Sequence, residues 1–200
     1  LGPDVQLAHA VWLDDGELDL VARRGASVVH CPVSNMYLGS GVARIRDMLD
    51  RGITVALATD GPGSNNRQDM FEACKTAVLL QKVNRLDATV LQPEEVLAMA
   101  CRNGAHLVDQ GDDLGAVEPG RKADLVVVDL GSPFVAPVHR VPSALVYCAT
   151  PRDVLHVMVD GHLLLRDRRL TRIDEEAALR RAEEAARRVF SRAGISTRLA

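Results

Sequence analysis

An aspartate follows an apolar run at the point where a short glycine-rich segment begins. The run Ala56–Thr59 leads into Asp60, and Gly61, Pro62 and Gly63 follow directly. A carboxylate at the end of a buried strand must be hydrogen-bonded or bound to a metal, because an isolated charge is costly there. Asp60 is therefore a candidate for acid–base or metal chemistry. Capping of a turn or a helix is the ordinary alternative.

Two histidines also lie in apolar runs of strand length. His9 interrupts the run Leu7–Leu13, and His30 and Cys31 end the run that begins at Ala26. A lone histidine in such a run more often packs in a core than binds a ligand. His30 and Cys31 are of metal-binding types, but they lack further ligands at standard spacing, which favours structural packing over a metal.

The elements that carry these residues are predicted to form three strand-helix units. Strands are predicted at residues 5–12, 26–31 and 53–59, and helices at residues 14–24, 42–50 and 69–83. Residues 32–41 and 61–68 are predicted loops. Apolar strands that alternate with amphipathic helices favour a parallel sheet covered by helices. In a parallel barrel the strand ends face one opening, so we expect His9, Asp60 and Ser64 to converge.

The pattern changes near Gly111. Before it, a second long helix is predicted at residues 92–108, because Pro93 and two glutamates suit a first helical turn. After a turn-rich segment, short strands are predicted at residues 123–130, 144–149, 154–159 and 162–166. The pair Asp160-Gly161 predicts a hairpin turn between the last two. This part favours a small antiparallel unit, followed by a solvated surface helix over residues 175–192.

Composition argues against several classes of partner. The 24 basic and 27 acidic residues give a formal net charge of -3, which supplies no electrostatic reason to bind nucleic acid or an anionic membrane. No run approaches the roughly 20 apolar residues of a membrane span. The four cysteines lack Cys-x-x-Cys spacing, which favours a reducing cytoplasm over a disulfide framework. A small-molecule partner is expected.

Taken together, the three strand ends resemble the amidohydrolase superfamily. The resemblance is to the branch that contains S-adenosylhomocysteine and methylthioadenosine deaminases and the triazine hydrolases. It covers the chain to about residue 174. The matching blocks, in chain order, are the strand around His9, then His30–Gly41, Thr59–Asn66, Asp69–Phe71, Leu79–Lys82 and Leu114–Leu125.

The resemblance implies an α/β fold in three parts. Residues 1–110 would be the carboxyl-terminal part of a (β/α)8 TIM barrel, residues 111–172 part of a small β-sandwich, and residues 173–200 a surface helix and tail. A whole barrel of this kind needs roughly 250 residues. We therefore expect a missing N-terminal part of the same protein, and a homo-oligomer.

The resemblance also implies roles for individual residues. Asp60 would ligate zinc, or Fe or another divalent metal, and take a proton from metal-bound water. His9 would polarise the attacked centre and stabilise the intermediate. Ser64, Asn65 and Asn66 would contact or shape the substrate site, although turn formation explains each equally well.

The His-x-His pair, the further histidine and the acidic glutamate of such enzymes have no counterpart in this sequence. His106, His139, His156 and His162 lie outside the strand ends, where structural or solvent-facing roles suit them. A catalytic zinc ordinarily needs three protein ligands, so the chain alone is expected to be inactive.

Three functions follow as alternatives. The first is hydrolytic deamination of an adenine-type nucleoside such as S-adenosylhomocysteine or methylthioadenosine. The second is deamination or dechlorination of another nitrogen heterocycle, such as 8-oxoguanine, a pterin or a triazine. The third is a non-catalytic structural or assembly subunit.

Overall fold

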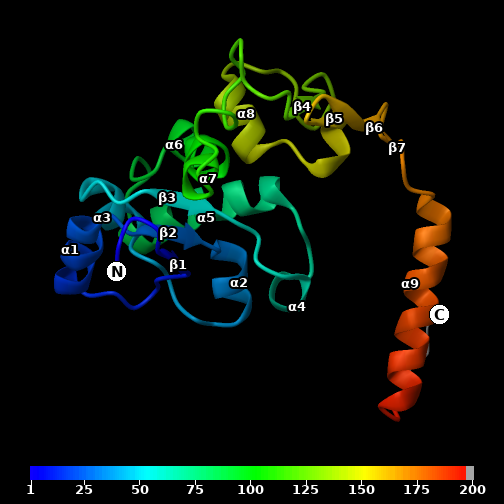
Figure 1. Ribbon diagram of the computed structural model, residues 1–200, viewed down its shortest axis with the longest axis horizontal. Helices are drawn as coiled ribbons and strands as arrows, with labels where there is room; N and C mark the ends of the chain where they lie inside the picture. The colour runs from blue at the N-terminus through cyan, green and yellow to red at the C-terminus, as the bar shows by residue number, and fades with distance from the viewer. Residues whose placement is uncertain (197–200) are drawn as a thin grey trace.

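The computed structural model describes residues 1–196 as two sheets with helices packed around the first (Figure 1). The first sheet is parallel, with strands in the order β1 (Gln6–Ala8), β2 (Ser27–His30) and β3 (Val55–Leu57). Val28 pairs with Leu7 on one side and with Val55 on the other. The predicted parallel sheet is therefore confirmed, although its strands are shorter than the apolar runs that predicted them.

Helices α1 (Asp15–Arg24), α3 (Ile45–Asp50) and α5 (Met70–Arg85) follow the three strands in turn. Asp14 begins α1 with a capping box, and Gly25 ends it in a left-handed conformation. Asp69 caps α5 by accepting bonds from two backbone N–H groups of its first turn. These local signals explain why the three helices lie close to their predicted positions.

Two predicted loops contain short helices instead. Residues 32–41 include α2 (Pro32–Tyr37), and residues 61–68 include α4 (Pro62–Asn65). Each helix has a proline in its first turn, where the fixed φ of proline suits a helix and its missing N–H costs nothing. Both segments are too short and too polar to show an apolar helical period.

The predicted helix at residues 92–108 is two helices, α6 (Pro93–Ala100) and α7 (Arg102–Leu107). Cys101 separates them with a backbone φ of -117° and ψ of -79°, well away from the regular α-helical values of about -63° and -42°. The predicted strand at residues 144–149 is wrong, because this segment belongs to α8 (Val141–Tyr147). Short apolar runs fit a buried strand and a buried helix equally well, and here Pro142 in the first turn favours the helix.

The second sheet is antiparallel and follows chain order. Its strands are β4 (Leu125–Val128), β5 (Val154–Val159), β6 (His162–Arg166) and β7 (Arg169–Leu170), with a 3-10 helix, η1 (Pro151–Asp153), before β5. Asp160 and Gly161 both have positive φ and make the predicted hairpin turn between β5 and β6. The sequence did not predict β7.

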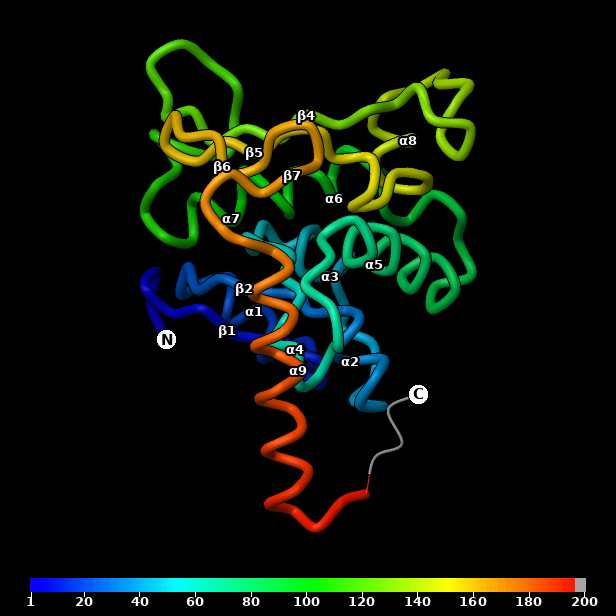
Figure 2. Tube along the Cα trace, turned by 90° about the vertical axis from the view of Figure 1, so that its right-hand side faces the viewer, coloured from blue at the N-terminus to red at the C-terminus, as the bar shows by residue number. Residues whose placement is uncertain are grey.

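The last helix, α9 (Glu175–Arg192), stands apart from both sheets in Figure 1, and in Figure 2 it leaves β7 and runs in front of the parallel sheet. It has no buried residue, as expected of a solvated surface helix. Among the described helices, none has both the length and the apolar content that a membrane crossing requires.

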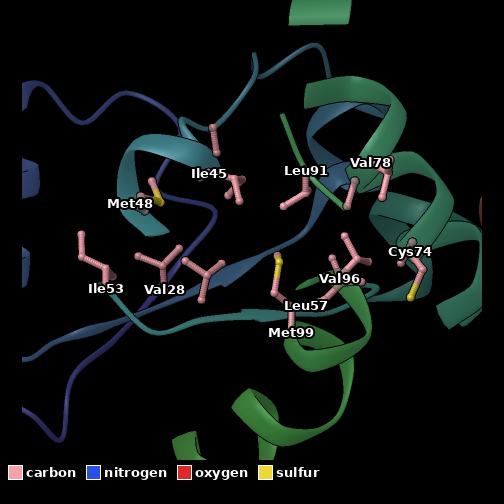
Figure 3. Packing of buried hydrophobic residues seen from close by; sticks show 14 of the residues in the cluster. Val28, Ile45, Met48, Ile53, Leu57, Cys74, Val78, Leu91, Val96 and Met99 are labelled. Atoms are coloured by element: carbon pink, nitrogen blue, oxygen red, sulfur yellow. The ribbon is translucent and has the colours of Figure 1, made fainter. Parts of the chain in front are cut away.

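The main core lies between the parallel sheet and its helices (Figure 3). The buried cluster combines residues of the sheet with residues of three helices. It includes Val28 and Leu57 of the sheet, Met48 of α3, Val78 of α5 and Met99 of α6. Full burial of such a side chain stabilises the fold by about 1.5–3 kcal/mol. This packing fixes the three strands relative to each other, and so it also fixes the residues at their carboxyl ends.

Candidate active site

His9 and Asp60 lie close together beyond the carboxyl ends of β1 and β3. Nε2 of His9 is 3.8 Å from Oδ2 of Asp60. Both residues have left-handed backbones, with φ of 66° and 63°, a conformation that is uncommon outside glycine. The predicted convergence of His9, Asp60 and Ser64 is confirmed, because Ser64 also donates a hydrogen bond to Asp60.

Three hydrogen bonds hold the Asp60 carboxylate. Ser34 Oγ donates to Oδ2 at 2.6 Å, Ser64 Oγ donates to the same oxygen at 2.8 Å, and the Gly61 N–H donates to Oδ1 at 2.7 Å. The bond from Ser34, followed by those from Gly61 and Ser64, lowers the pKa of Asp60 to about 2. Asp60 is therefore ionised at neutral pH and suited to bind a cation.

The two carboxylate oxygens of Asp60 differ in how many of their lone pairs remain free. Oδ2 accepts two hydroxyl bonds, whereas Oδ1 accepts only the Gly61 N–H. A carboxylate oxygen has two lone pairs, so Oδ1 keeps one for a further partner. Ser64 Oγ also lies 3.1 Å from the Gly61 carbonyl oxygen, which gives its proton an alternative acceptor.

His9 is held from the other side of the ring. Its Nδ1 lies 2.8 Å from Oδ1 of Asn35, while Nε2 faces Asp60. The His9 side chain is 40% exposed and the Asp60 side chain 31%, so both groups are open to a small molecule.

Ser34 and Asn35 contact the site, although the sequence alone assigned them no role. They are 0% and 1% exposed on α2 and bond to Asp60 and His9 respectively. Their sequence signals are two adjacent polar residues shortly after a strand end and their place within the family segment His30–Gly41. That signal does not reveal which side chains they reach, because the partners belong to other strands.

Asn65 and Asn66 occupy loop-forming positions. Asn65 is buried and its Nδ2 donates to the Thr59 carbonyl oxygen at 2.6 Å. Asn66 ends α4 in a left-handed conformation, and its N–H donates to the Pro62 carbonyl oxygen. These contacts match the turn-forming alternative, and substrate contact by either residue stays a prediction.

His30 and Cys31 are packed rather than poised for chemistry. His30 is fully buried, and neither ring nitrogen has a hydrogen-bond partner within residues 1–196. Burial lowers the pKa of His30 to about 3 and raises the pKa of the Cys31 thiol to about 11. A protonated thiol is a poor metal ligand, which agrees with the packing role favoured by the sequence.

The described residues supply one ligand of a metal site and not a complete set of ligands. Within residues 1–196, no group of three or more His, Cys, Asp or Glu side chains is placed to hold a metal ion. A catalytic zinc ordinarily takes three protein ligands. Asp60, ionised and with a free lone pair on Oδ1, suits one of these positions.

Residues 1–164 match the family profile described as "Amidohydrolase family". The chain belongs to the amidohydrolase family. This membership confirms the resemblance to the amidohydrolase superfamily that the residues at the strand ends indicated.

Individual relatives agree with this placement. The amidohydrolase chain is 44% identical to a "5'-deoxyadenosine deaminase" of Methanosarcina mazei over 96% of its own length. It is also 44% identical to a "5-methylthioadenosine/S-adenosylhomocysteine deaminase" of Haloarcula marismortui over 97% of its length. The chain spans 44% of the length of each of these relatives.

Solved structures of the family have the same fold. An adenosine deaminase from Xanthomonas campestris with bound zinc superposes with a TM-score of 0.92 at 36% identity, over 95% of this amidohydrolase chain and 43% of that one. A triazine hydrolase variant superposes with a TM-score of 0.86 at 29% identity, over 92% of this chain and 40% of that one. The α/β fold of the family is therefore shown for this chain.

Proposed function

We propose that the complete protein hydrolytically deaminates an adenine-type nucleoside, such as S-adenosylhomocysteine, methylthioadenosine or 5'-deoxyadenosine. The observation that carries the proposal is the pairing of His9 with the hydroxyl-anchored carboxylate of Asp60 at one edge of the sheet. Relatives named as deaminases of such nucleosides support the substrate class.

In this proposal Asp60 supplies one ligand to a divalent metal, zinc in the first instance and Fe or another metal as the alternative. When bound, such a metal lowers the pKa of water towards about 7 and so supplies hydroxide at neutral pH. The free lone pair on Oδ1 suits the ligand role, and the low pKa keeps Asp60 charged. We further propose that the remaining ligands lie outside the described residues.

Asp60 also acts as the proton carrier between the attacking water and the leaving amine. When Ser64 turns its proton to the Gly61 carbonyl oxygen, a lone pair on Oδ2 is freed to accept a proton. Because its hydrogen bonds lower the pKa of Asp60, the protonated carboxyl group readily passes that proton on to the leaving amine nitrogen. His9 presents Nε2 next to Oδ2, and when Nε2 carries a proton it can donate to the attacked ring and stabilise the negative charge that develops there.

We propose the finer architecture on the same basis. Residues 1–110 would contribute the last strand-helix units of a TIM barrel, residues 111–172 part of a β-sandwich domain, and residues 173–200 a surface helix and tail. The parallel sheet, the antiparallel sheet and the exposed α9 support this division. The missing barrel strands would come from an N-terminal part of the same protein. We also propose a homo-oligomer, and a cytoplasmic location because the four cysteines are free.

The test is ammonia release by the complete protein from a panel of adenosine derivatives, 8-oxoguanine, a pterin and triazines. Metal content is measured on each variant in parallel. Asp60→Asn removes a ligand charge and the proton carrier, so both metal content and turnover should fall strongly. His9→Ala should lower turnover and leave the metal largely in place.

A matched control is Asp87→Asn. Asp87 also accepts a hydroxyl and a backbone N–H, both from Thr89, but it lies in the loop after α5. Its substitution should change neither metal content nor turnover. Full activity of Asp60→Asn with unchanged metal would show that the centre is assigned wrongly.

The panel also separates the other two functions. The likeness to a triazine hydrolase is the observation that favours a second substrate class. Preference for 8-oxoguanine, a pterin or a triazine would replace the nucleoside with that heterocycle. A complete protein without bound metal and without turnover on any compound would support the non-catalytic subunit.

A further inference from the structure

The helix that follows the central strand touches both flanking strand ends. In the order β1-β2-β3, the chain leaves β2 and enters α2, which starts at Pro32 (Figure 1). Ser34 and Asn35 are neighbours on α2, so their side chains point about 100° apart. Ser34 reaches Asp60 beyond β3, and Asn35 reaches His9 beyond β1. One turn of helix thus contacts both groups of the site.

The contact made by Asn35 fixes the state of the His9 ring. Oδ1 of an amide only accepts hydrogen bonds. A neutral His9 must therefore carry its proton on Nδ1, and its lone pair lies on Nε2, on the side of Asp60. The partner of one imidazole nitrogen sets the chemistry of the other in this way.

Asn35 is poorly explained as a stabilising residue. It is 1% exposed, yet its Nδ2 has no hydrogen-bond partner among the described residues. A buried donor without a partner costs about 1–3 kcal/mol. An apolar side chain at this position would avoid that cost, so the benefit of the amide must come from Oδ1. The contact that Oδ1 makes is with His9.

We propose that Asn35 is a positioning residue that holds the His9 ring in one orientation and in its Nδ1–H form, with Nε2 presented to the substrate. This inference rests on the proposed function of His9. Asn35 acts through His9 and has no assigned contact with the substrate or the metal.

The test compares Asn35→Leu, which removes the acceptor, with Asn35→Asp, which keeps it. Nitrogen-15 NMR of histidine side chains at pH 8 reports which ring nitrogen carries the proton, and loss of a signal in His9→Gln assigns His9. We expect the Nδ1–H pattern in the wild type and in Asn35→Asp. Asn35→Leu should shift His9 towards Nε2–H or a mixture.

Activity of the complete protein gives a second readout. Loss of a side chain that orients a functional histidine typically costs about 10–100-fold. We expect Asn35→Leu to lower kcat by about this factor with little change in KM, and Asn35→Asp to recover part of it. Asn35→Leu should not lower Tm, because it removes an unpartnered buried amide. If leucine is too large to fold there, Asn35→Ala carries the NMR and kinetic comparisons.

Asn103→Leu is the matched control. The side-chain amide of Asn103 is also partly buried. Unlike that of Asn35, its Nδ2 has a partner, because it donates to the Val55 carbonyl oxygen at 2.8 Å and so supports β3. Its substitution should lower Tm and leave the His9 ring unchanged. An unchanged His9 ring in Asn35→Leu, or an equal fall of kcat in Asn35→Leu and Asn103→Leu, would overturn the proposal. A shifted ring in a protein without turnover would instead refute the proposed function and leave the positioning role intact.

Discussion

Replacing His30 with leucine should stabilise the protein. His30 ends β2 and is fully buried, and its two ring nitrogens have no hydrogen-bond partner in the described part of the chain. Each unpartnered buried polar atom costs about 1–3 kcal/mol. A swap between side chains of similar volume costs less than about 1.5 kcal/mol. His30→Leu should therefore raise the free energy of unfolding at pH 8 by at least about 0.5 kcal/mol.

The stabilisation should grow as the pH falls. Burial lowers the pKa of His30 to about 3, so the folded state leaves His30 neutral at pH 5. The unfolded histidine, with a pKa of about 6.5, binds a proton there. The unfolded state thus gains protons first, and wild-type stability falls as the pH drops from about 6.5 towards 3. A pH of 5 lies about 1.5 pH units below the pKa of the unfolded histidine, and each unit lowers the free energy of unfolding by about 1.36 kcal/mol. At pH 5 the wild type has therefore lost about 2 kcal/mol of stability. His30→Leu does not suffer this loss.

Urea unfolding followed by far-ultraviolet circular dichroism at pH 8 and pH 5 measures both effects. Trp12 is a poor fluorescence probe because it is 83% exposed. The exposed His162 supplies the control, and His162→Gln should differ from the wild type equally at both pH values. A difference between His30→Leu and wild type that does not change with pH would refute the reasoning. It would mean that the folded protein gives the His30 ring a partner.

Substitutions at three further positions test other parts of the molecule. Gly115→Ala should lower the free energy of unfolding by at least about 1–2 kcal/mol in urea titrations, because φ is +86° and the new Cβ would lie 2.8 Å from Cα of Arg102. Asp69→Ala should cost about 1 kcal/mol by removing the cap of α5, whereas Asp69→Asn should cost less. The bonds that lower the pKa of Asp60 stabilise the fold above about pH 4, and this contribution is lost as pH falls towards 2. In acid titrations the stability gap between wild type and Asp60→Ala should therefore narrow over that range; a constant gap would contradict the pKa.

Continuous apolar strands and strong local signals account for what the sequence predicted well. The run through Val55 to Leu57 is buried on both faces, as a parallel strand must be, and it forms β3. Asp14 and Gly25 mark the two ends of α1, and Asp160-Gly161 makes the hairpin of the second sheet. In each case the deciding interaction lies within a few residues of the signal.

The features that the sequence did not predict depend on contacts between residues that are far apart in the chain. The segment at residues 144–149 is apolar and short, so its pattern fits a strand as well as a helix, and in the fold most of it belongs to α8, which packs against α5 and α6. Ser34 and Asn35 lie within the family segment His30–Gly41, but their contacts with Asp60 and His9 join three different strands. Such contacts depend on strand order and helix placement, which a local pattern does not contain.

Several energetic costs in this fold lie where the chemistry is proposed. His9 and Asp60 hold left-handed backbones, and each such residue costs about 1–3 kcal/mol unless its surroundings fix it. The surroundings do fix them: the His9 N–H bonds to the Val29 carbonyl oxygen, and Gln68 Nε2 bonds to the Asp60 carbonyl oxygen. His30, Asn35 and Asn65 add buried polar atoms that have no hydrogen-bond partner among the described residues, at the same edge of the sheet. A sequence selected for stability alone would place apolar side chains there, so this edge is retained for what it binds or transforms.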